Sequence, residues 1–298
     1  MPMRLRIRNI FKLLQEAFQE WQEDKVSRLA AALAYYTVFS ITPLLIIAIA
    51  IAGAVFGREA AEGEIMGQLQ DLVGEQGAQA IAVALQNASQ PSAIGIASLI
   101  SIAFLLLGAS GVFAELQDSL NTVWNVKPKP GQGFWQFIRK RLLSFAMVLS
   151  IGFLLLVSLI ISAALSALSR FEVNILPGFE YLWEILNFFV SFGTITLLFA
   201  LMYKYVPDAK IAWKDVWIGA MITALLFTIG KSILGIYLGR GSLGSAYGAA
   251  GSLVVFLAWV YYSAQILFFG AEVTQVYARR YGSKIVPDKN AEPISSSQ

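Results

Sequence analysis

Residues 33–56 read LAYYTVFSITPLLIIAIAIAGAVF, a run without one charged side chain. A hydrocarbon core about 30 Å thick requires roughly 20 apolar residues of helix, so this run is long enough to cross a bilayer. Inside lipid a helix satisfies its own backbone hydrogen bonds. Five further stretches have a similar character, at residues 94–114, 142–165, 181–205, 216–238 and 246–270. The sequence therefore predicts an all-α integral membrane protein, a bundle of six transmembrane helices.

The composition supports a membrane protein and excludes several kinds of chemistry. Hydrophobic residues make up 57% of the 298 residues and charged residues 14%, whereas soluble domains have about 45–50% and about 25%. The chain has no Cys and no His. Disulfides, thiolate ligands and the commonest general base near neutral pH are therefore absent. We expect no enzyme activity, no metal site and no cofactor.

The basic residues are distributed unevenly between the connecting segments. Of the 22 Lys and Arg residues, eighteen lie in the N-terminal segment, the second connection, the fourth connection with the last turn of the span before it, and the C-terminal segment. The intervening connections carry only Arg58, Arg170 and Arg240, and Lys231 lies within a span. Positive residues collect on the cytoplasmic side of membrane proteins, so both termini are expected in the cytoplasm. Because orientation accounts for these charges, no nucleic-acid partner is expected.

The segments outside the spans have their own patterns. Residues 1–32 form an amphipathic cytoplasmic segment, with an interfacial helix expected over Arg8–Trp21. The first external connection, residues 57–90, is acidic and is expected to hold one short amphipathic helix near residues 65–73. The transmembrane domain is expected over residues 33–270. Residues 271–298 form a cytoplasmic tail, with disorder expected from Pro287 onward.

A polar stripe runs along the predicted fourth span. Glu180, Glu184, Asn187, Ser191 and Thr194 recur at spacings that place them on one helix face. Polar groups at this depth normally face a bundle interior or a water-filled cavity. Alternatively, the glutamates favour the helix N-terminus and the other side chains form interhelical hydrogen bonds.

Two other residues within spans could belong to the same route. Lys231 lies about 10 Å from the outer end of the fifth span, and we predict that it pairs with the polar stripe. The alternative is that it reaches the outer headgroups. Pro43, in the first span, predicts a kink of the kind found at transporter sites, or a packing feature alone. The predicted substrate pathway comprises Glu184, Asn187, Ser191, Thr194, Lys231 and Pro43.

A second group of polar residues lies at the predicted cytoplasmic ends of the spans. Glu115 and Asp118 follow the second span and Glu272 ends the sixth, where acids oppose the helix macrodipole and require a partner. Arg28 is the candidate partner, and Gln265 shares a face with Glu272. A cytoplasmic gate is hypothesised from Arg28, Glu115, Asp118, Gln265 and Glu272. Interfacial anchoring is the alternative.

Glycines cluster where the fifth span meets the sixth. Gly235 and Gly239, and likewise Gly244 and Gly248, are spaced four residues apart. Such pairs of small residues allow membrane helices to approach closely. They predict tight packing between the two spans.

Four segments together resemble one known family. They are LAAALAYYTVFSITPLL (29–45), SGVFAELQDSLNTVW (110–124), YKYVPDAKIAWKD (203–215) and YGAAGSLVVFLAWVYYSAQILFFGAEVTQVYARR (247–280). In this order they are similar to the YihY/BrkB family of bacterial inner-membrane proteins. The resemblance implies a bacterial cytoplasmic membrane protein, from a family linked to serum resistance and to lipid or envelope transport. The family's old label, ribonuclease BN, conflicts with a chain that has no His ligands.

Two functions follow as hypotheses. The first is an inner-membrane transporter or exporter of a lipid, a lipid-linked molecule or an amphipathic anionic molecule, acting in envelope maintenance. Its expected partners are membrane lipid and such a lipid-linked or anionic small molecule. The alternative is a non-transporting membrane scaffold or envelope-assembly partner.

Overall fold

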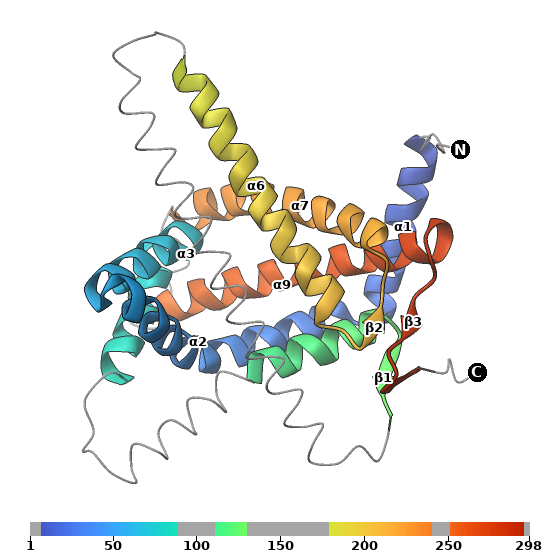
Figure 1. The fold of residues 1–298 in the computed structure, drawn as a ribbon, viewed down its shortest axis with the longest axis horizontal. Helices are drawn as coiled ribbons and strands as arrows, with labels where there is room; N and C mark the ends of the chain where they lie inside the picture. Colours follow the sequence, from blue (N-terminus) through green and yellow to red (C-terminus); the bar gives the residue numbers. More distant parts are fainter. Residues whose placement is uncertain (1–6, 89–110, 130–178, 240–250, 295–298) are drawn as a thin grey trace.

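The computed structural model describes residues 7–88, 111–129, 179–239 and 251–294. The helices in these ranges are α1 (Ile7–Glu23), α2 (Val26–Phe56), α3 (Arg58–Ala88), α6 (Phe179–Tyr205), α7 (Trp213–Gly239) and α9 (Gly251–Tyr281). Residues 111–123 are also helical. Four short strands complete the described elements: β1 (Val126–Pro128), β2 (Ala209–Lys210), β3 (Val286–Pro287) and β4 (Ala291–Pro293). Figure 1 shows α2, α7 and α9 extending side by side, with α6 crossing them.

Four helices in the described ranges are long and apolar enough to cross a membrane. The candidate segments are Val26–Ala54, Phe188–Tyr205, Trp213–Ile233 and Leu253–Tyr281. They correspond to the first, fourth, fifth and sixth predicted spans. Residues 142–165 and most of 94–114 lie outside the described residues. The helical membrane fold is thus supported, and the total of six spans stays a prediction.

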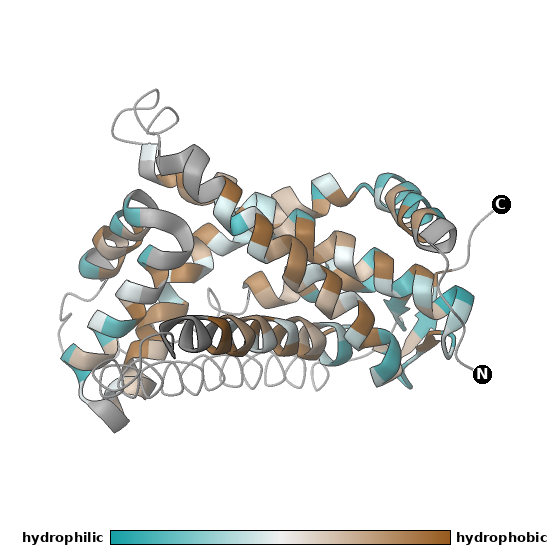
Figure 2. Cartoon of the chain, turned by 90° about the horizontal axis from the view of Figure 1, so that it is seen from above, coloured by the Kyte–Doolittle hydropathy of each residue, from teal (hydrophilic) through white to brown (hydrophobic). Residues whose placement is uncertain are grey.

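The outer face of α7 is apolar over most of its length. Trp217, Met221, Leu225, Ile229 and Ile233 are spaced four residues apart, and all five side chains are exposed. Residues at this spacing lie on one face of a helix. In Figure 2 hydrophobic residues extend along the long helices, while hydrophilic residues are frequent near the two chain ends. We interpret the outer face of α7 as a surface that contacts lipid.

Helices α7 and α9 pack so closely that two positions accept only glycine. A Cβ atom built on Gly219 of α7 would lie 1.5 Å from Thr274 Oγ1 of α9. Reciprocally, a Cβ atom on Gly270 of α9 would lie 1.7 Å from Thr223 Oγ1 of α7. Each threonine donates its hydroxyl hydrogen to a carbonyl of its own helix, Thr223 to Gly219 and Thr274 to Gly270, both at 2.7 Å. The polar groups are therefore satisfied where the backbones approach.

This contact differs from the one that the sequence predicts. The spacing argument favoured Gly235, Gly239, Gly244 and Gly248, but the last two lie outside the described residues. Gly219 and Gly270 each stand four residues before a threonine, so the small-residue pattern is glycine with threonine rather than glycine with glycine. The hydroxyl fills the space that a second glycine would leave.

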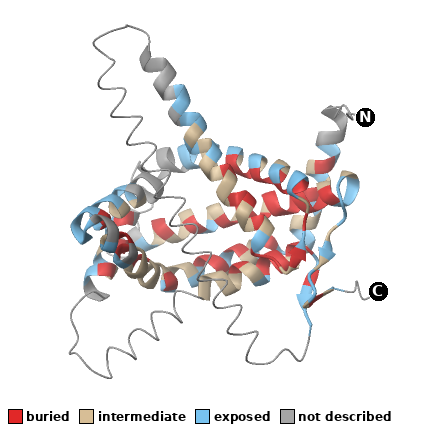
Figure 3. Cartoon of the chain, in the orientation of Figure 1, coloured by how far each residue is buried: buried red, intermediate tan, exposed pale blue. Residues whose placement is uncertain are grey.

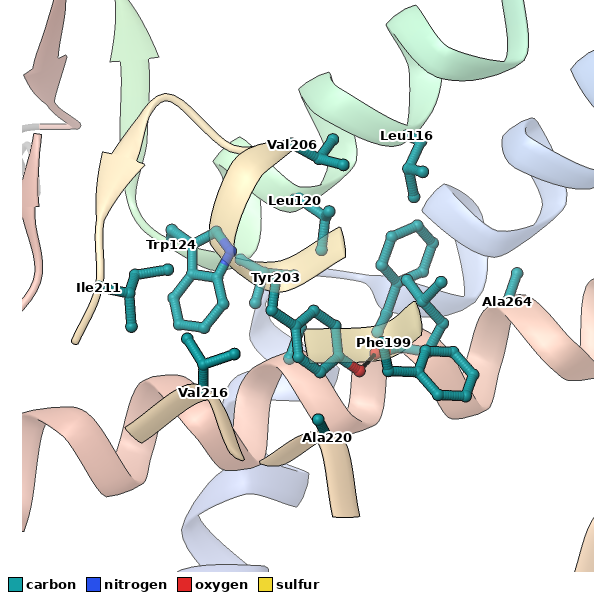
Figure 4. Close-up of a cluster of buried hydrophobic side chains, with 14 of the residues drawn as sticks. Leu116, Leu120, Trp124, Phe199, Tyr203, Val206, Ile211, Val216, Ala220 and Ala264 are labelled. Atoms are coloured by element: carbon teal, nitrogen blue, oxygen red, sulfur yellow. Dashed lines mark hydrogen bonds between the residues drawn. The ribbon is translucent and has the colours of Figure 1, made fainter. Parts of the chain in front are cut away.

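The largest buried cluster joins α6 to the α7–α9 pair. Tyr203 of α6 is fully buried, donates to the carbonyl of Leu267 at 2.6 Å and lies 2.9 Å from the hydroxyl of Thr223. The rings of Trp124 and Phe199 pack against Tyr203 at 6.4 and 6.3 Å between centroids (Figure 4). Figure 3 shows buried residues concentrated along α7, α9 and the first half of α2. One tyrosine thus connects three elements of the core.

Three helices extend beyond their predicted limits. Helix α2 begins at Val26 rather than at residue 33, and α3 has 31 residues where a short helix was expected near 65–73. Helix α9 continues to Tyr281, past its predicted end at residue 270. The added turns of α9 bury Val273 and Val276 against α1. As a result, Glu272 lies inside a helix and not at its end.

The prediction of disorder from Pro287 is wrong for residues 287–294. Strand β3 pairs with β2 and strand β4 with β1, both antiparallel. Backbone bonds beyond the strands fasten the same segment: Lys129 N donates to Asn290 O at 3.1 Å, and Asp288 N donates to Asp208 O at 2.9 Å. A polar segment can therefore be ordered by pairing with distant connections. Residues 295–298 lie outside the described part.

Replacing Gly219 by Ala is expected to lower the free energy of unfolding by about 1–3 kcal/mol, because the new methyl group overlaps Thr274. The matched control is Gly193→Ala on α6, where no heavy atom lies within 4 Å of the added Cβ. There alanine should be neutral or stabilising by up to about 1 kcal/mol. Thermal unfolding of the two variants in detergent checks this. Equal melting temperatures would contradict the close packing.

Candidate functional site

The described residues bring ionisable side chains together where α1 meets α9. The chain turns at Lys25, which adopts a left-handed backbone conformation (φ 53°, ψ 44°). Before it, Asp24 N donates to Glu20 O at 2.8 Å and closes the last turn of α1. This turn sets α1 beside the end of α9 (Figure 1), where Leu13 and Ala17 are buried. It also directs Asp24 toward α9.

Glu272 of α9 is the most unusual residue of this region. The residue is 0% exposed, and neither carboxyl oxygen has a hydrogen-bond partner among the described residues. Its side chain lies within hydrogen-bonding reach of the Asp24 carboxyl. Asp24 Oδ2 is likewise buried without a donor. Ionised carboxylates only accept hydrogen bonds, so a bond between these two requires a proton on one of them.

Two arginines at the end of α9 bind the acids of α1. Arg279 Nη2 donates to Glu16 Oε1 at 2.8 Å and to Glu20 Oε1 at 2.7 Å. Arg280 pairs with Glu16 as well. These interactions attach α1 to α9. The partners of the two arginines are Glu16 and Glu20. The pair formed by Asp24 and Glu272 receives no hydrogen bond from either arginine in the described structure.

The surroundings of Asp24 raise its pKa to about 6. Burial is the largest cause, followed by the negative charge of Glu20; the capacity of a protonated Glu272 to donate to Asp24 opposes the rise, and the charge of Glu23 adds to it. In the unfolded chain the same carboxyl titrates near pH 3.8. Between these values the folded state binds the proton more strongly, so this contribution to stability grows as pH falls through about 6.

The predicted gate residues are only partly brought together. Gln265 and Glu272 lie on α9, and Gln265 Oε1 is buried without a partner among the described residues. Glu115 accepts a hydrogen bond from Ser119 Oγ at 3.5 Å. Burial and then the charge of the exposed Asp118 raise the pKa of Glu115. Arg28 is exposed on the first turn of α2, and it takes part in none of the ion pairs found in the described ranges.

The partner of Glu272 was not foreseen from the sequence. It is Asp24 in the α1–α2 turn rather than Arg28. Glu16, Glu20 and Asp24 stand four residues apart, so they form one acidic face along α1 and its end. That spacing is a signal that could have pointed to the cluster.

The predicted substrate pathway is described only in part. The side chains of Glu184 and Asn187 on α6 lie outside the described set, so their pairing with Lys231 stays a prediction. Lys231 is exposed on α7, and Ser191 is exposed on α6. Thr194 donates to the carbonyl of Val190 on its own helix at 2.9 Å. This bond fits the simpler interpretation of the stripe as far as Thr194 is concerned.

Pro43 lies inside α2, which stays helical from Val26 to Phe56. The assigned helix is thus not broken at this proline. Beyond Pro43, α2 and α3 line an open pocket of about 220 Å³. It is lined by Ile46, Ile49, Ala50, Gly53, Arg58, Glu62 and Leu85. An apolar wall from both helices therefore meets one basic and one acidic side chain of α3.

At the end of the bundle away from this pocket, the connections between helices are joined by polar networks. Asn121 Nδ2 donates to Asp208 Oδ2 at 2.9 Å, and Asp208 N donates to Asn121 Oδ1 at 2.7 Å. Gln117 Nε2 adds a bond to Asp208 Oδ1 at 3.1 Å. In α7 the buried Asp215 accepts hydrogen bonds from Ser283 N and Oγ at 3.1 and 3.0 Å. These networks hold the end of α9 and the helix before β1 in place.

Replacing Asn121 by Ala is expected to destabilise the protein by about 2–3 kcal/mol, because it removes a donor to a carboxylate and a partner of a backbone N–H. The control is Gln15→Ala at an exposed position of α1, which should change stability by less than about 0.5 kcal/mol. Denaturation in detergent measures both. A silent Asn121→Ala would show that the network is not stabilising.

Replacing Arg279 by Gln is expected to weaken the docking of α1 by about 1–2 kcal/mol, since two partly exposed charge-assisted bonds are lost. Hydrogen exchange of residues 7–23 should become faster, with little change in α7. Lys284→Gln, at an exposed position beyond α9, is the control. Unchanged protection of α1 in Arg279→Gln would contradict the assigned role of these pairs.

Similar proteins are membrane proteins of several bacteria. A UPF0761 membrane protein of Mannheimia succiniciproducens is 29% identical over 280 residues, which covers 92% of this chain and 92% of that protein. One of Aggregatibacter aphrophilus is 28% identical over 293 residues, covering 94% and 96%. The chain spans only 60% of a longer relative from Verminephrobacter eiseniae, with 28% identity and 86% of this chain covered.

No solved structure matches this chain. Residues 17–295 match the family described as Virulence factor BrkB. This range includes all four segments on which the resemblance was based, together with the second part of α1, the end of α9 and the four strands. The chain is therefore a member of the YihY/BrkB family of membrane proteins.

Proposed function

We propose that this protein is a transporter or exporter of the bacterial cytoplasmic membrane that acts on a lipid, a lipid-linked molecule or another amphipathic anion in envelope maintenance. The observation that carries the proposal is the pocket between α2 and α3, where apolar side chains meet Arg58 and Glu62. In the proposed orientation both termini are cytoplasmic. The pocket then lies at the outer end of α2.

The two chemical surfaces of the pocket suit an amphipathic ligand. Ile46, Ile49 and Leu85 offer a wall on which an acyl or other hydrocarbon chain can pack. The guanidinium of Arg58 can bind a phosphate or carboxylate with two parallel hydrogen bonds. Glu62, one helical turn further on, can accept hydrogen bonds from hydroxyl groups of the same headgroup. A purely apolar lipid would leave both side chains unused.

The buried acidic residues favour a transporter over a scaffold that only binds partner proteins. Ionisable residues in membrane bundles are costly and commonly mark pathways or proton relays. Glu272 occupies such a position without a donor among the described residues. A purely structural bundle would be more stable with an apolar residue there. The cost favours a transporter over a scaffold.

One observation favours the alternative, a non-transporting scaffold or envelope-assembly partner. Tyr35 and Phe39 of α2 are 60% and 62% exposed, and their rings contact each other at 4.9 Å between centroids. Tyr36 is exposed next to them. Aromatic side chains are enriched in protein interfaces. A scaffold would bind a partner on this surface, and Tyr35→Ala would then abolish partner binding without affecting any lipid movement.

Replacing Arg58 by Ala should reduce transport of a fluorescent anionic lipid by about tenfold or more in vesicles that contain the purified protein. The basis is the loss of a charge-assisted hydrogen bond, which is worth about 1.5–3 kcal/mol. Lys231→Ala should also reduce transport if the α6–α7 face belongs to the route. Lys284→Ala, exposed beyond the other end of α9, should leave the rate unchanged.

The vesicle experiment can contradict the proposal in two ways. Lipid that crosses no faster with the protein than without it would argue against transport. Equal rates for the original chain and Arg58→Ala would remove the pocket from the pathway. A zwitterionic lipid of the same chain length, which should move more slowly, tests the preference for an anion.

A further inference from the structure

We propose that Asp24 and Glu272 form a proton-binding site, and that the bound proton locks α1 onto α9. The site is made by two segments that are far apart in the sequence: the α1–α2 turn, which carries Asp24, and the last third of α9, which carries Glu272. Its ligand is a single exchangeable proton shared by two carboxyl groups. The proposal does not depend on what the protein transports.

The geometry of the carboxyl pair calls for a donor that the described side chains do not supply. Glu272 is completely buried, both of its oxygens lack a partner, and Asp24 Oδ2 is in the same condition. The two side chains nevertheless lie within hydrogen-bonding reach of each other. Buried polar atoms are nearly always hydrogen-bonded in native proteins. One proton on either carboxyl allows a hydrogen bond in which each carboxyl group takes part.

The charged groups around the pair do not remove this requirement. From α1, Glu16, Glu20 and Glu23 add negative charge. From α9, Arg279 and Arg280 are positive; Arg279 donates hydrogen bonds to Glu16 and Glu20, and Arg280 forms an ion pair with Glu16. From the α1–α2 turn and the start of α2, Lys25 and Arg28 are exposed. Carboxyl groups therefore outnumber the cations that contact the cluster.

Loss of the proton has a mechanical consequence for α1. Two ionised carboxylates would then face each other in a buried position, with Glu20 close by, and like charges at such short range repel strongly. The repulsion acts between the α1–α2 turn and α9, and thus opposes the docking of α1. The arginine pairs oppose separation. Docking of α1 is therefore tight when the proton is bound and looser when it has left.

Helix α1 has apolar side chains on two faces, one buried against α9 and one exposed. Leu13 and Ala17 bury one face against α9, whereas Phe11 and Phe18 are 70% and 49% exposed on the other. A released helix of this kind can lie in the membrane interface. The proton thus selects between α1 held by α9 and α1 held by lipid.

Infrared difference spectroscopy of the full chain in lipid nanodiscs tests the site directly. Raising the pH from about 5 to about 10 should remove the carbonyl band of a protonated, buried carboxylic acid, with a midpoint above that of an ordinary Asp or Glu. The band should be absent in Glu272→Gln and in Asp24→Asn. Glu64→Gln, exposed on α3, is the matched control and should retain it. Asp24→Asn, at a turn, keeps the test usable if Glu272→Gln does not fold.

The chain has no cysteine, so the movement of α1 can be followed with two introduced spin labels. Labels at Gln19 on α1 and Tyr261 on α9, both exposed, should give a narrow distance distribution at about pH 5 and a broader one at about pH 10. In Glu272→Gln the distribution should stay narrow at both values, because the amide cannot ionise.

Three results would overturn the proposal. The first is a titrating band that survives in both Glu272→Gln and Asp24→Asn. The second is a distance distribution that is equally narrow at both pH values in the original chain. The third is a midpoint that moves when sodium replaces choline in the buffer, which would show that a metal cation competes for the carboxyl pair.

Discussion

The close contact between α7 and α9 is the interaction on which the rest of the described structure depends. Lipid gives helices no hydrophobic reason to associate, so packing and hydrogen bonds must hold them together. Gly219 and Gly270 let the two backbones approach, and Thr223 and Thr274 fill the remaining space with hydroxyls already bonded to their own helices. Tyr203 then attaches α6 by contacting Thr223 and the carbonyl of Leu267. A third helix is thus joined at the same level.

The same contact fixes where α9 goes beyond it. Past Gly270 the helix continues to Tyr281, and its last turns carry Glu272 and the arginines to α1. Beyond the helix, Ser283 binds Asp215 at the start of α7, at a place where a Cβ on Gly282 would lie 2.4 Å from the Asp215 carboxylate. The position of Glu272 is therefore set from both sides. Its buried carboxyl is a consequence of rigid packing as much as of its own contacts.

The sequence was most informative about helices, because their length and their buried face depend on residues that are close together in the chain. Apolar length placed α2, α6, α7 and α9, because a span must satisfy its own backbone over a fixed thickness. The three- and four-residue spacing of Phe11, Leu14 and Phe18 located α1. Helix α3 was underestimated because glutamates and glycines interrupt its apolar pattern, while its length is supported by packing on α2 and α9.

What the sequence did not reveal depends on partners far along the chain. Strands β3 and β4 have no pattern of their own and exist because β2 and β1 offer backbone groups to pair with. Glu272 was recognised as a residue in need of a partner, but Asp24 comes from a turn whose direction is set by the left-handed conformation of Lys25. No periodicity in α9 could have indicated it. For the same reason the pocket between α2 and α3 was not foreseen, since it requires α3 as a complete helix.

The pairing of β3 with β2 and of β4 with β1 can form only late in the synthesis of the chain. Strands β1 and β2 leave the ribosome long before residues 286–293. Their pairing partners, β4 and β3, lie in those later residues. Until then the connections around residues 126–128 and 209–210 remain open at the membrane surface. Synthesis of residues 286–293 is therefore the step that allows the connections before α7 and after the helix of residues 111–123 to be paired.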